Sequence, residues 1–147
     1  MKTITYSVNP IRKITLTFVF IALLTATGSA ISDPVPPEKE SGIKRERLGM
    51  LDLSEEIKDL DSSRYLFLSF LVTIEPGGVS TLHDHVNRPE HTYIISGTLT
   101  DYPKDGDAKE YGPGSNLVVP SDTVHWFANR GKEPVVLIAT FPYKSAR

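Results

Sequence analysis

The sequence contains no cysteine, and this absence excludes several kinds of chemistry at once. Disulfide bonds cannot cross-link the fold, thiolates cannot ligate a metal, and no cysteine is available as a nucleophile or a site for lipid attachment. Stability must therefore come from a hydrophobic core, helped by metal binding or dimerisation.

An excess of positive charge is also missing. The chain has 16 Lys and Arg against 18 Asp and Glu, which gives a formal net charge of −2. Residues 31–147 lack Lys2, Arg12 and Lys13 but keep every acidic residue, so their formal charge is 13 − 18 = −5. Because no basic stripe or arginine-rich aromatic patch offsets this charge, we expect no nucleic-acid partner.

A long apolar run is absent as well. The apolar stretch over residues 14–26 contains three threonines and is shorter than the roughly 20 residues of a membrane span. It follows a basic start and precedes Gly28-Ser29-Ala30, which is the layout of a secretory signal peptide. We predict that residues 1–30 are a signal peptide cleaved after Ala30, so that the protein is periplasmic or secreted with no stable membrane span. An uncleaved anchor is the alternative.

The next segment, residues 31–63, is predicted to be an N-terminal arm with a leading strand or short helix. Residues 31–40 are rich in proline and charge, which favours an extended arm, either a linker or a strap on a neighbouring subunit. Further on, Ser54 is a possible helix cap with Ile57 and Leu60 on one face, and a turn preceded by a strand is the other interpretation.

Residues 64–147 carry β-strand signals. Residues 65–74 are dense in strand formers and apolar on both faces, as in a strand between layers or covered by a partner, and Glu75-Pro76-Gly77-Gly78 predicts a turn after them. Further strand-like segments, separated by turn signals, cover residues 79–85, 92–101, 109–111, 116–119, 123–129 and 135–141. This spacing predicts one all-β sandwich or barrel.

Four potential ligand residues lie in two of these regions. His83 and His85 are one residue apart, so their side chains share one face of a strand. Glu90 follows a turn shaped by Pro89 and can point to the same side, while His125 lies in a separate predicted strand. One histidine alone is more often a packed core residue, but three imidazoles and a carboxylate that converge would bind a divalent first-row metal. The ligand types do not distinguish Fe, Mn, Zn, Ni and Cu.

The spacing of these residues resembles two motifs of the cupin superfamily. The first is Gly77-x5-His83-x-His85-x4-Glu90-x6-Gly97, and the second is Gly114-x5-Pro120-x-Asp122-x2-His125-x3-Asn129. Asp122 replaces the usual inner glycine of the second motif, a substitution that a turn tolerates. The resemblance implies a small exported single-domain cupin with a double-stranded β-helix, or jelly-roll barrel. It also implies that His83, His85, Glu90 and His125 hold the metal.

The sequence predicts less specific roles for the other residues near the motifs. His91 follows Glu90 and faces the other way on a strand, so we expect packing between sheets or at a dimer interface. Arg88 is interpreted as a solvated loop charge or a partner of Asp84, with contact to a substrate carboxylate as the alternative. Phe127 is expected to line the cavity and Trp126 to face away. Packing is the favoured role of three tyrosines, namely Tyr93, Tyr102 and Tyr111.

The resemblance favours a metal-dependent enzyme, dioxygenase-like, acting on an unidentified small molecule, with no catalytic residue assigned. Cupin isomerases and lyases share the ligand set, and a non-catalytic metal-anchored binding or sensing module is the other class. A site closed off by Ile94, Leu99, Val118 and Phe127 would favour the binding module. A barrel that has lost its chemistry is disfavoured by the complete ligand set. The apolar strand over residues 66–74 and the family resemblance together predict a homodimer.

Overall fold

The computed structural model describes residues 34–59 and 65–145. The predicted signal peptide and Leu60 lie outside this part of the chain. The elements within it are β1 (Ser41–Asp52), α1 (Leu53–Glu56), β2 (Tyr65–Val79), β3 (His83–Asp84), β4 (Glu90–Ser96), β5 (Leu99–Pro103), β6 (Lys109–Tyr111), β7 (Asn116–Val119), β8 (Val124–Asn129) and β9 (Val135–Lys144). Among these described residues, no helix is long and apolar enough to cross a membrane.

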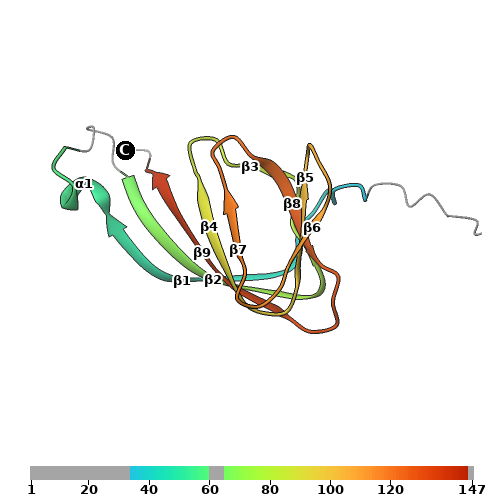
Figure 1. Ribbon diagram of the computed structural model, residues 1–147. Helices are drawn as coiled ribbons and strands as arrows, with labels where there is room; N and C mark the ends of the chain where they lie inside the picture. Colours follow the sequence, from blue (N-terminus) through green and yellow to red (C-terminus); the bar gives the residue numbers. More distant parts are fainter. Residues whose placement is uncertain (1–33, 60–64, 146–147) are drawn as a thin grey trace, which may run out of the picture. The chain divides into compact units, whose positions relative to one another are not determined.

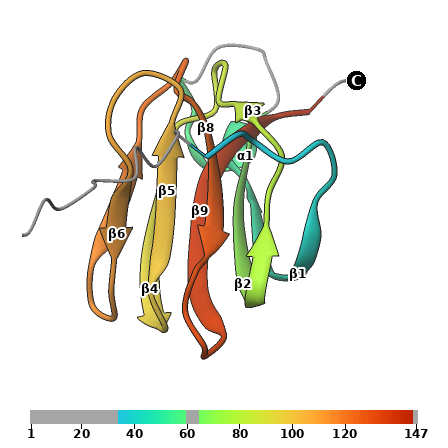
Figure 2. The same cartoon turned by 90° about the vertical axis from the view of Figure 1, so that its right-hand side faces the viewer.

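The strands form a nearly closed antiparallel β-barrel of the jelly-roll type, which confirms the predicted fold class. Neighbouring strands follow the order β6-β5-β8-β2-β9-β4-β7, with β1 paired to β2 and β3 paired to β8 (Figures 1 and 2). The barrel has two layers of strands, one containing β9 and the other β8. The long strand β2 belongs to both, because it pairs with β9 along most of its length and with β8 at Val79. The site described below lies between the two layers.

The predicted turn at residues 75–78 is wrong, because β2 continues through these residues to Val79. Pairing with β1 overrides the local turn chemistry: Ile43 pairs with Ile74, and after a register shift Ser41 pairs with Val79. A Cβ on Gly78 would lie 2.9 Å from the carbonyl oxygen of Gly42, so the glycine permits close approach of β1. In the predicted strand over residues 79–85, only β3 forms.

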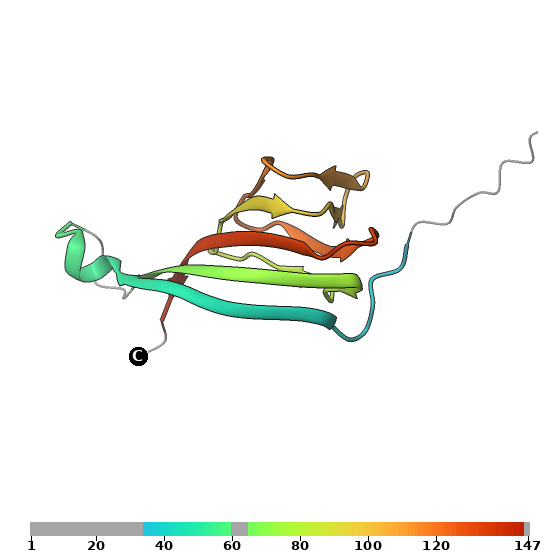
Figure 3. The ribbon, with the colours of Figure 1, turned by 90° about the horizontal axis from the view of Figure 1, so that it is seen from below.

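The segment before β2 forms both a strand and a helix. β1 pairs with β2 along its length and runs with it toward α1 (Figure 3). The N-cap of α1 is Asp52, whose side chain accepts a hydrogen bond from the Ser54 backbone N–H, so Ser54 is not the cap. Ser54 Oγ instead accepts from the backbone N–H of Tyr65 at 3.1 Å. Ile57 is 47% exposed and does not form a buried helix face.

The core follows from the alternation of side chains along the strands. On β4, Thr92 and Ile94 are buried, whereas His91, Tyr93 and Ile95 are exposed. The buried apolar side chains form one cluster, made of Val72, Ile74, Ile94, Leu99, Leu117, Val119, Val135, Leu137 and Ala139. Burying each of the larger ones contributes about 1.5–3 kcal/mol. This cluster fixes the register that carries the polar residues of the site.

Candidate metal centre

Three histidines converge inside the barrel because of how β3 pairs with β8. His83 and His125 are opposite one another in this antiparallel pair, and His85 follows β3 on the same face as His83. The three ring centroids lie 4.7–5.2 Å apart. One ring nitrogen from each histidine lies within 4.8 Å of the others. The structure therefore brings together three of the four predicted ligands.

A hydrogen bond fixes the orientation of each ring through Nδ1. The partners are the backbone carbonyls of Thr81 for His83 (2.9 Å) and of Arg88 for His85 (3.1 Å), and the carboxylate of Asp101 for His125 (2.6 Å). Each partner atom is an acceptor, so Nδ1 carries the proton and Nε2 keeps its lone pair. This tautomer is the one that ligates a metal through Nε2.

The Nε2 atoms of His85 and His125 are 3.0 Å apart. With both protons on Nδ1, two lone pairs face each other at this distance, and they are stabilised by a proton or a metal ion between them. Burial, and next the positive charge of Arg88, lower the pKa of His85 to about 4. Burial also lowers the pKa of His83. These lowered pKa values favour neutral His83 and His85 rings near pH 7, and a divalent metal fits the set of three histidines.

Glu90, the predicted fourth ligand, lines the same cavity but belongs to a different network. One of its carboxylate oxygens accepts from Thr92 Oγ1 at 3.0 Å, and the other accepts from Arg88 Nη1 at 3.2 Å. Its ligation stays a prediction.

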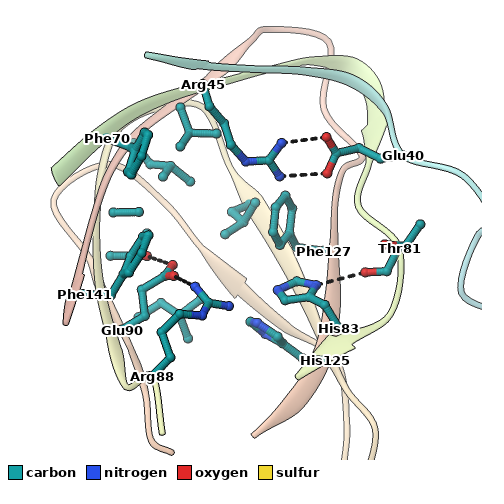
Figure 4. A pocket seen from close by; sticks show the side chains of 16 residues that line it. Glu40, Arg45, Phe70, Thr81, His83, Arg88, Glu90, His125, Phe127 and Phe141 are labelled. Carbon is teal, nitrogen blue, oxygen red and sulfur yellow. Dashed lines mark hydrogen bonds and ion pairs between the residues drawn. The ribbon is translucent and has the colours of Figure 1, made fainter. Parts of the chain in front are cut away.

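Arg88 is not a solvated loop charge. Its guanidinium also donates to the Asp84 backbone carbonyl at 3.3 Å and lies over the Phe141 ring, 4.9 Å from the centroid. It does not pair with the Asp84 carboxylate, and it points into the cavity beside Glu90 (Figure 4).

His83 and His125 line one end of a cavity of about 320 Å³, and His85, which is not part of the lining, contacts His125. Its walls are mostly apolar, with three phenylalanines, Phe70, Phe127 and Phe141, visible in Figure 4. At the other end, Glu40 and Arg45 form an ion pair with N···O of 2.6 Å, and their side chains are 37% and 43% exposed. This hydrogen-bonded pairing lowers the pKa of Glu40. The exposure of the pair shows that the cavity reaches the surface here.

The site is not closed off by the four residues named from the sequence. Leu99 and Phe127 do line the cavity, as expected for Phe127. Ile94 is fully buried in the core, and Val118 is 66% exposed on the outer face.

The fold also tests the predictions for His91, Trp126 and the tyrosines. His91 is exposed on the outer face of β4, which confirms that it points away from the three histidines, but it does not pack between sheets. Trp126 is buried and stacks on Tyr102 at 4.0 Å between centroids, outside the cavity lining. Tyr111 packs against the core, and Tyr93 is 44% exposed rather than packed.

Asp101 and the Glu40–Arg45 pair were missed from the sequence. Asp101 is 6% exposed and faces His125 because β5 pairs with β8 in a register that the sequence does not specify. A single Asp in an otherwise strand-like segment was the available signal. Arg45 lies in a segment whose strand was predicted only as one of two alternatives.

Comparisons with known proteins agree with this architecture. The model of the cupin domain family (Cupin_2) matches residues 70–141, which include all four predicted ligands. Oxalate decarboxylase OxdC of Bacillus subtilis is 40% identical over 77 residues, which are 50% of this chain and 20% of that protein. A putative mannose-1-phosphate guanylyltransferase of Vibrio cholerae is 36% identical over 67 residues, covering 46% of this chain and 14% of that one. The chain thus spans a fifth or less of these curated relatives.

A solved structure gives the same fold. The polyketide cyclase RemF of Streptomyces resistomycificus superposes with a TM-score of 0.56 at 18% identity, covering 73% of this chain and 70% of RemF. At this identity the likeness concerns the fold alone. Together with the family match and the two motifs, it shows that the chain belongs to the cupin superfamily.

Proposed function

We propose that this protein is a metal-dependent enzyme, dioxygenase-like, that acts on a small molecule in the periplasm or outside the cell. The observation that carries the proposal is the convergence of three imidazoles, each held by an Nδ1 hydrogen bond, two of which line a cavity that reaches the surface. The predicted signal sequence supports export, and the exposed apolar residues of the outer sheet face support a homodimer.

In this proposal each residue has a defined role. His83, His85 and His125 would hold the metal through Nε2, and Glu90 would supply the fourth ligand. A bound metal supplies a Lewis acid, or a redox centre if it is Fe, Mn or Cu. Arg88, fixed against Phe141, offers a positive charge next to the reacting end of a substrate. The apolar walls exclude water and so strengthen electrostatic contacts inside the cavity.

The matched region of OxdC, an oxalate decarboxylase by name, supports chemistry on a small acid. It does not separate a dioxygenase from a lyase or an isomerase, because the same ligands serve all three.

The first test is metal binding by the full chain expressed with its N-terminal segment and purified from the exported fraction. We expect about one Fe, Mn, Zn, Ni or Cu per chain, measured by elemental analysis, and strong loss of metal in His83→Gln and His125→Gln. His91→Gln is the matched control, since His91 is exposed on the other face. Protein without metal, or equal loss in the control, would overturn the proposal.

The second test addresses turnover. Metal-loaded protein should consume dioxygen with a member of a panel of small carboxylic acids, and Glu90→Gln should abolish this uptake while the variant keeps its unfolding midpoint. Carbon dioxide release without dioxygen uptake would reassign the protein as a lyase. Metal binding with neither signal would favour the binding or sensing module.

A further inference from the structure

Glu40 and Arg45 form a bidentate ion pair at the open end of the cavity. Arg45 Nη1 donates to one carboxylate oxygen of Glu40 at 2.6 Å, and Nη2 donates to the other at 2.7 Å. Both side chains belong to the cavity lining, across from the histidines (Figure 4). A planar guanidinium that presents two parallel N–H groups recognises a carboxylate in this way, whichever molecule carries it.

Glu40 lies where it can move away from Arg45 without disturbing the sheet. It lies just before Ser41, the first residue of β1, whereas Arg45 is fixed within the strand opposite Val72. Moving Glu40 therefore breaks no strand pairing. An ion pair this exposed contributes little to stability, so a second carboxylate can replace Glu40 on Arg45 at small cost.

The cavity behind the pair favours an anion once Glu40 has left. Its charged lining then consists of two guanidiniums, Arg45 and Arg88, and one carboxylate, Glu90. Phe127 lies between the ion pair and His83, and Phe70 lies on the Arg45 side of the cavity (Figure 4).

We infer that the substrate of this site is a carboxylate with a compact apolar or aromatic body, and that its carboxylate replaces Glu40 on Arg45. Its apolar body then lies along the phenylalanines, and its far end reaches the histidines. Glu40 occupies the position of the ligand's carboxylate when the site is empty. This inference deepens the proposed function and rests on it for the identity of the site, but the anchor itself needs no metal.

The test is binding of paired probes to metal-free full-length protein, which excludes direct binding to a metal. Benzoate, phenylacetate and hexanoate are compared with benzamide, phenylacetamide and hexanamide by calorimetry. We expect at least one acid to bind about tenfold or more tightly than its amide, because the amide lacks the charge that Arg45 recognises.

The variants separate Arg45 from general charge effects. Glu40→Gln should tighten acid binding several-fold by removing the competing carboxylate, and Arg45→Gln should weaken it about tenfold or more. Glu46→Gln and Arg47→Gln, on the same strand but outside the cavity lining, should leave it unchanged. Unfolding midpoints of all four variants confirm that they fold.

Two results would overturn the inference: no acid preferred over its amide in both the wild type and Glu40→Gln, or acid binding lost in Arg88→Gln but kept in Arg45→Gln. A Zn²⁺ titration of the same preparations distinguishes this failure from that of the proposed function. Zn²⁺ binding with no acid preference defeats only the inference, whereas acid binding without Zn²⁺ binding defeats the metal site and leaves the anchor in place.

Discussion

Asp101 fixes the orientation and the tautomer of the His125 ring. Its carboxylate lies 2.6 Å from His125 Nδ1, and the two side chains are 8% and 4% exposed. A buried carboxylate behind a ligating imidazole holds the ring in position and raises its basicity toward a metal. Thr81 and Arg88 offer the other two histidines a neutral backbone carbonyl instead. His125 is thus the histidine with the strongest electrostatic support.

Asp101→Asn should therefore weaken metal binding by about 10–100-fold without unfolding the protein. An amide carries no charge and can present its N–H₂ to Nδ1, which would favour the wrong tautomer. The measurement is the Zn²⁺ dissociation constant by chelator competition across pH 6–8. Asp107→Asn, a substitution in an exposed loop, is the matched control. Equal affinity in the two variants would show that Asp101 does not position His125.

The buried histidines also predict how the stability of the metal-free protein depends on pH. The pKa of His85 is about 4 in the folded state, below its ordinary value of 6.5. The unfolded chain therefore takes up this proton first, so the stabilisation is present above pH 6.5 and is lost as pH falls from 6.5 toward 4. The full effect is on the order of 3 kcal/mol.

Urea unfolding of the metal-free protein at pH 7, 6 and 5 measures this loss. His85→Gln should flatten the pH dependence over this range, and His91→Gln should leave it as in the wild type. A wild-type free energy of unfolding that stays constant from pH 7 to pH 5 would contradict the prediction.

The convergence of the three histidines could be predicted from the sequence, whereas the residues that hold their rings could not. His83 and His85 share a face by the two-residue period of a strand, and the motif spacing added His125. The hydrogen bond from Asp101 depends on the register between β5 and β8, and the position of Arg45 depends on the pairing of β1 with β2. Register depends on contacts between distant segments, which local patterns do not encode.

At the scale of elements, pairing between distant segments also explains why the turn predicted at residues 75–78 is wrong. Glu75-Pro76-Gly77-Gly78 has the composition of a turn, and Gly77 does adopt a left-handed φ of +78°. Pairing with β1 uses this conformation as an irregularity within a strand instead of an end to it. The strands predicted over residues 109–111, 116–119, 123–129 and 135–141 were located well, because turn signals separate them. The single strand predicted over residues 92–101 is wrong, because the chain forms two strands there, β4 and β5, separated at Gly97.

Gly97, between β4 and β5, tests how much the stability of the barrel depends on glycines with a left-handed φ. Its φ is +75°, and a Cβ there would lie 2.6 Å from the Pro134 carbonyl oxygen and 2.8 Å from Val135 Cα. Gly114 has a similar φ of +83° but open space around it. The two glycines therefore separate the cost of backbone strain from the cost of overpacking.

Gly114→Ala should destabilise the protein by about 1–2 kcal/mol, from the left-handed backbone alone. Gly97→Ala should cost about 2–5 kcal/mol, because overpacking against rigid backbone adds to the strain. Urea unfolding of both variants at one pH gives the comparison. Equal losses would show that the loop before Val135 can move away from the added methyl group.

At the scale of the whole molecule, the outer face of the sheet opposite the cavity is unusually apolar. Exposed side chains on it include Phe67, Tyr93, Ile95 and Val118, with fractional exposures of 40–66%. They lie on neighbouring strands, since β7 pairs with β4, β4 with β9, and β9 with β2. Exposed apolar side chains gathered on neighbouring strands favour an interaction surface here.

We expect this face to form the homodimer interface. In sedimentation velocity at micromolar concentration, the wild type should be a dimer. Val118→Lys should shift it to the monomer, because the buried interface would then contain an unpaired charge. Val118 is 66% exposed within one chain, so the substitution should leave the fold of the monomer intact. Val86→Lys is the matched control, since Val86 is 57% exposed in the loop between β3 and β4, away from this face. A wild-type monomer at this concentration, or a dimer that survives Val118→Lys, would exclude this face as the interface.

The site residues do not come from this face, so metal binding should persist in the monomeric variant. Loss of metal binding in that variant would mean that the barrel itself depends on the second copy.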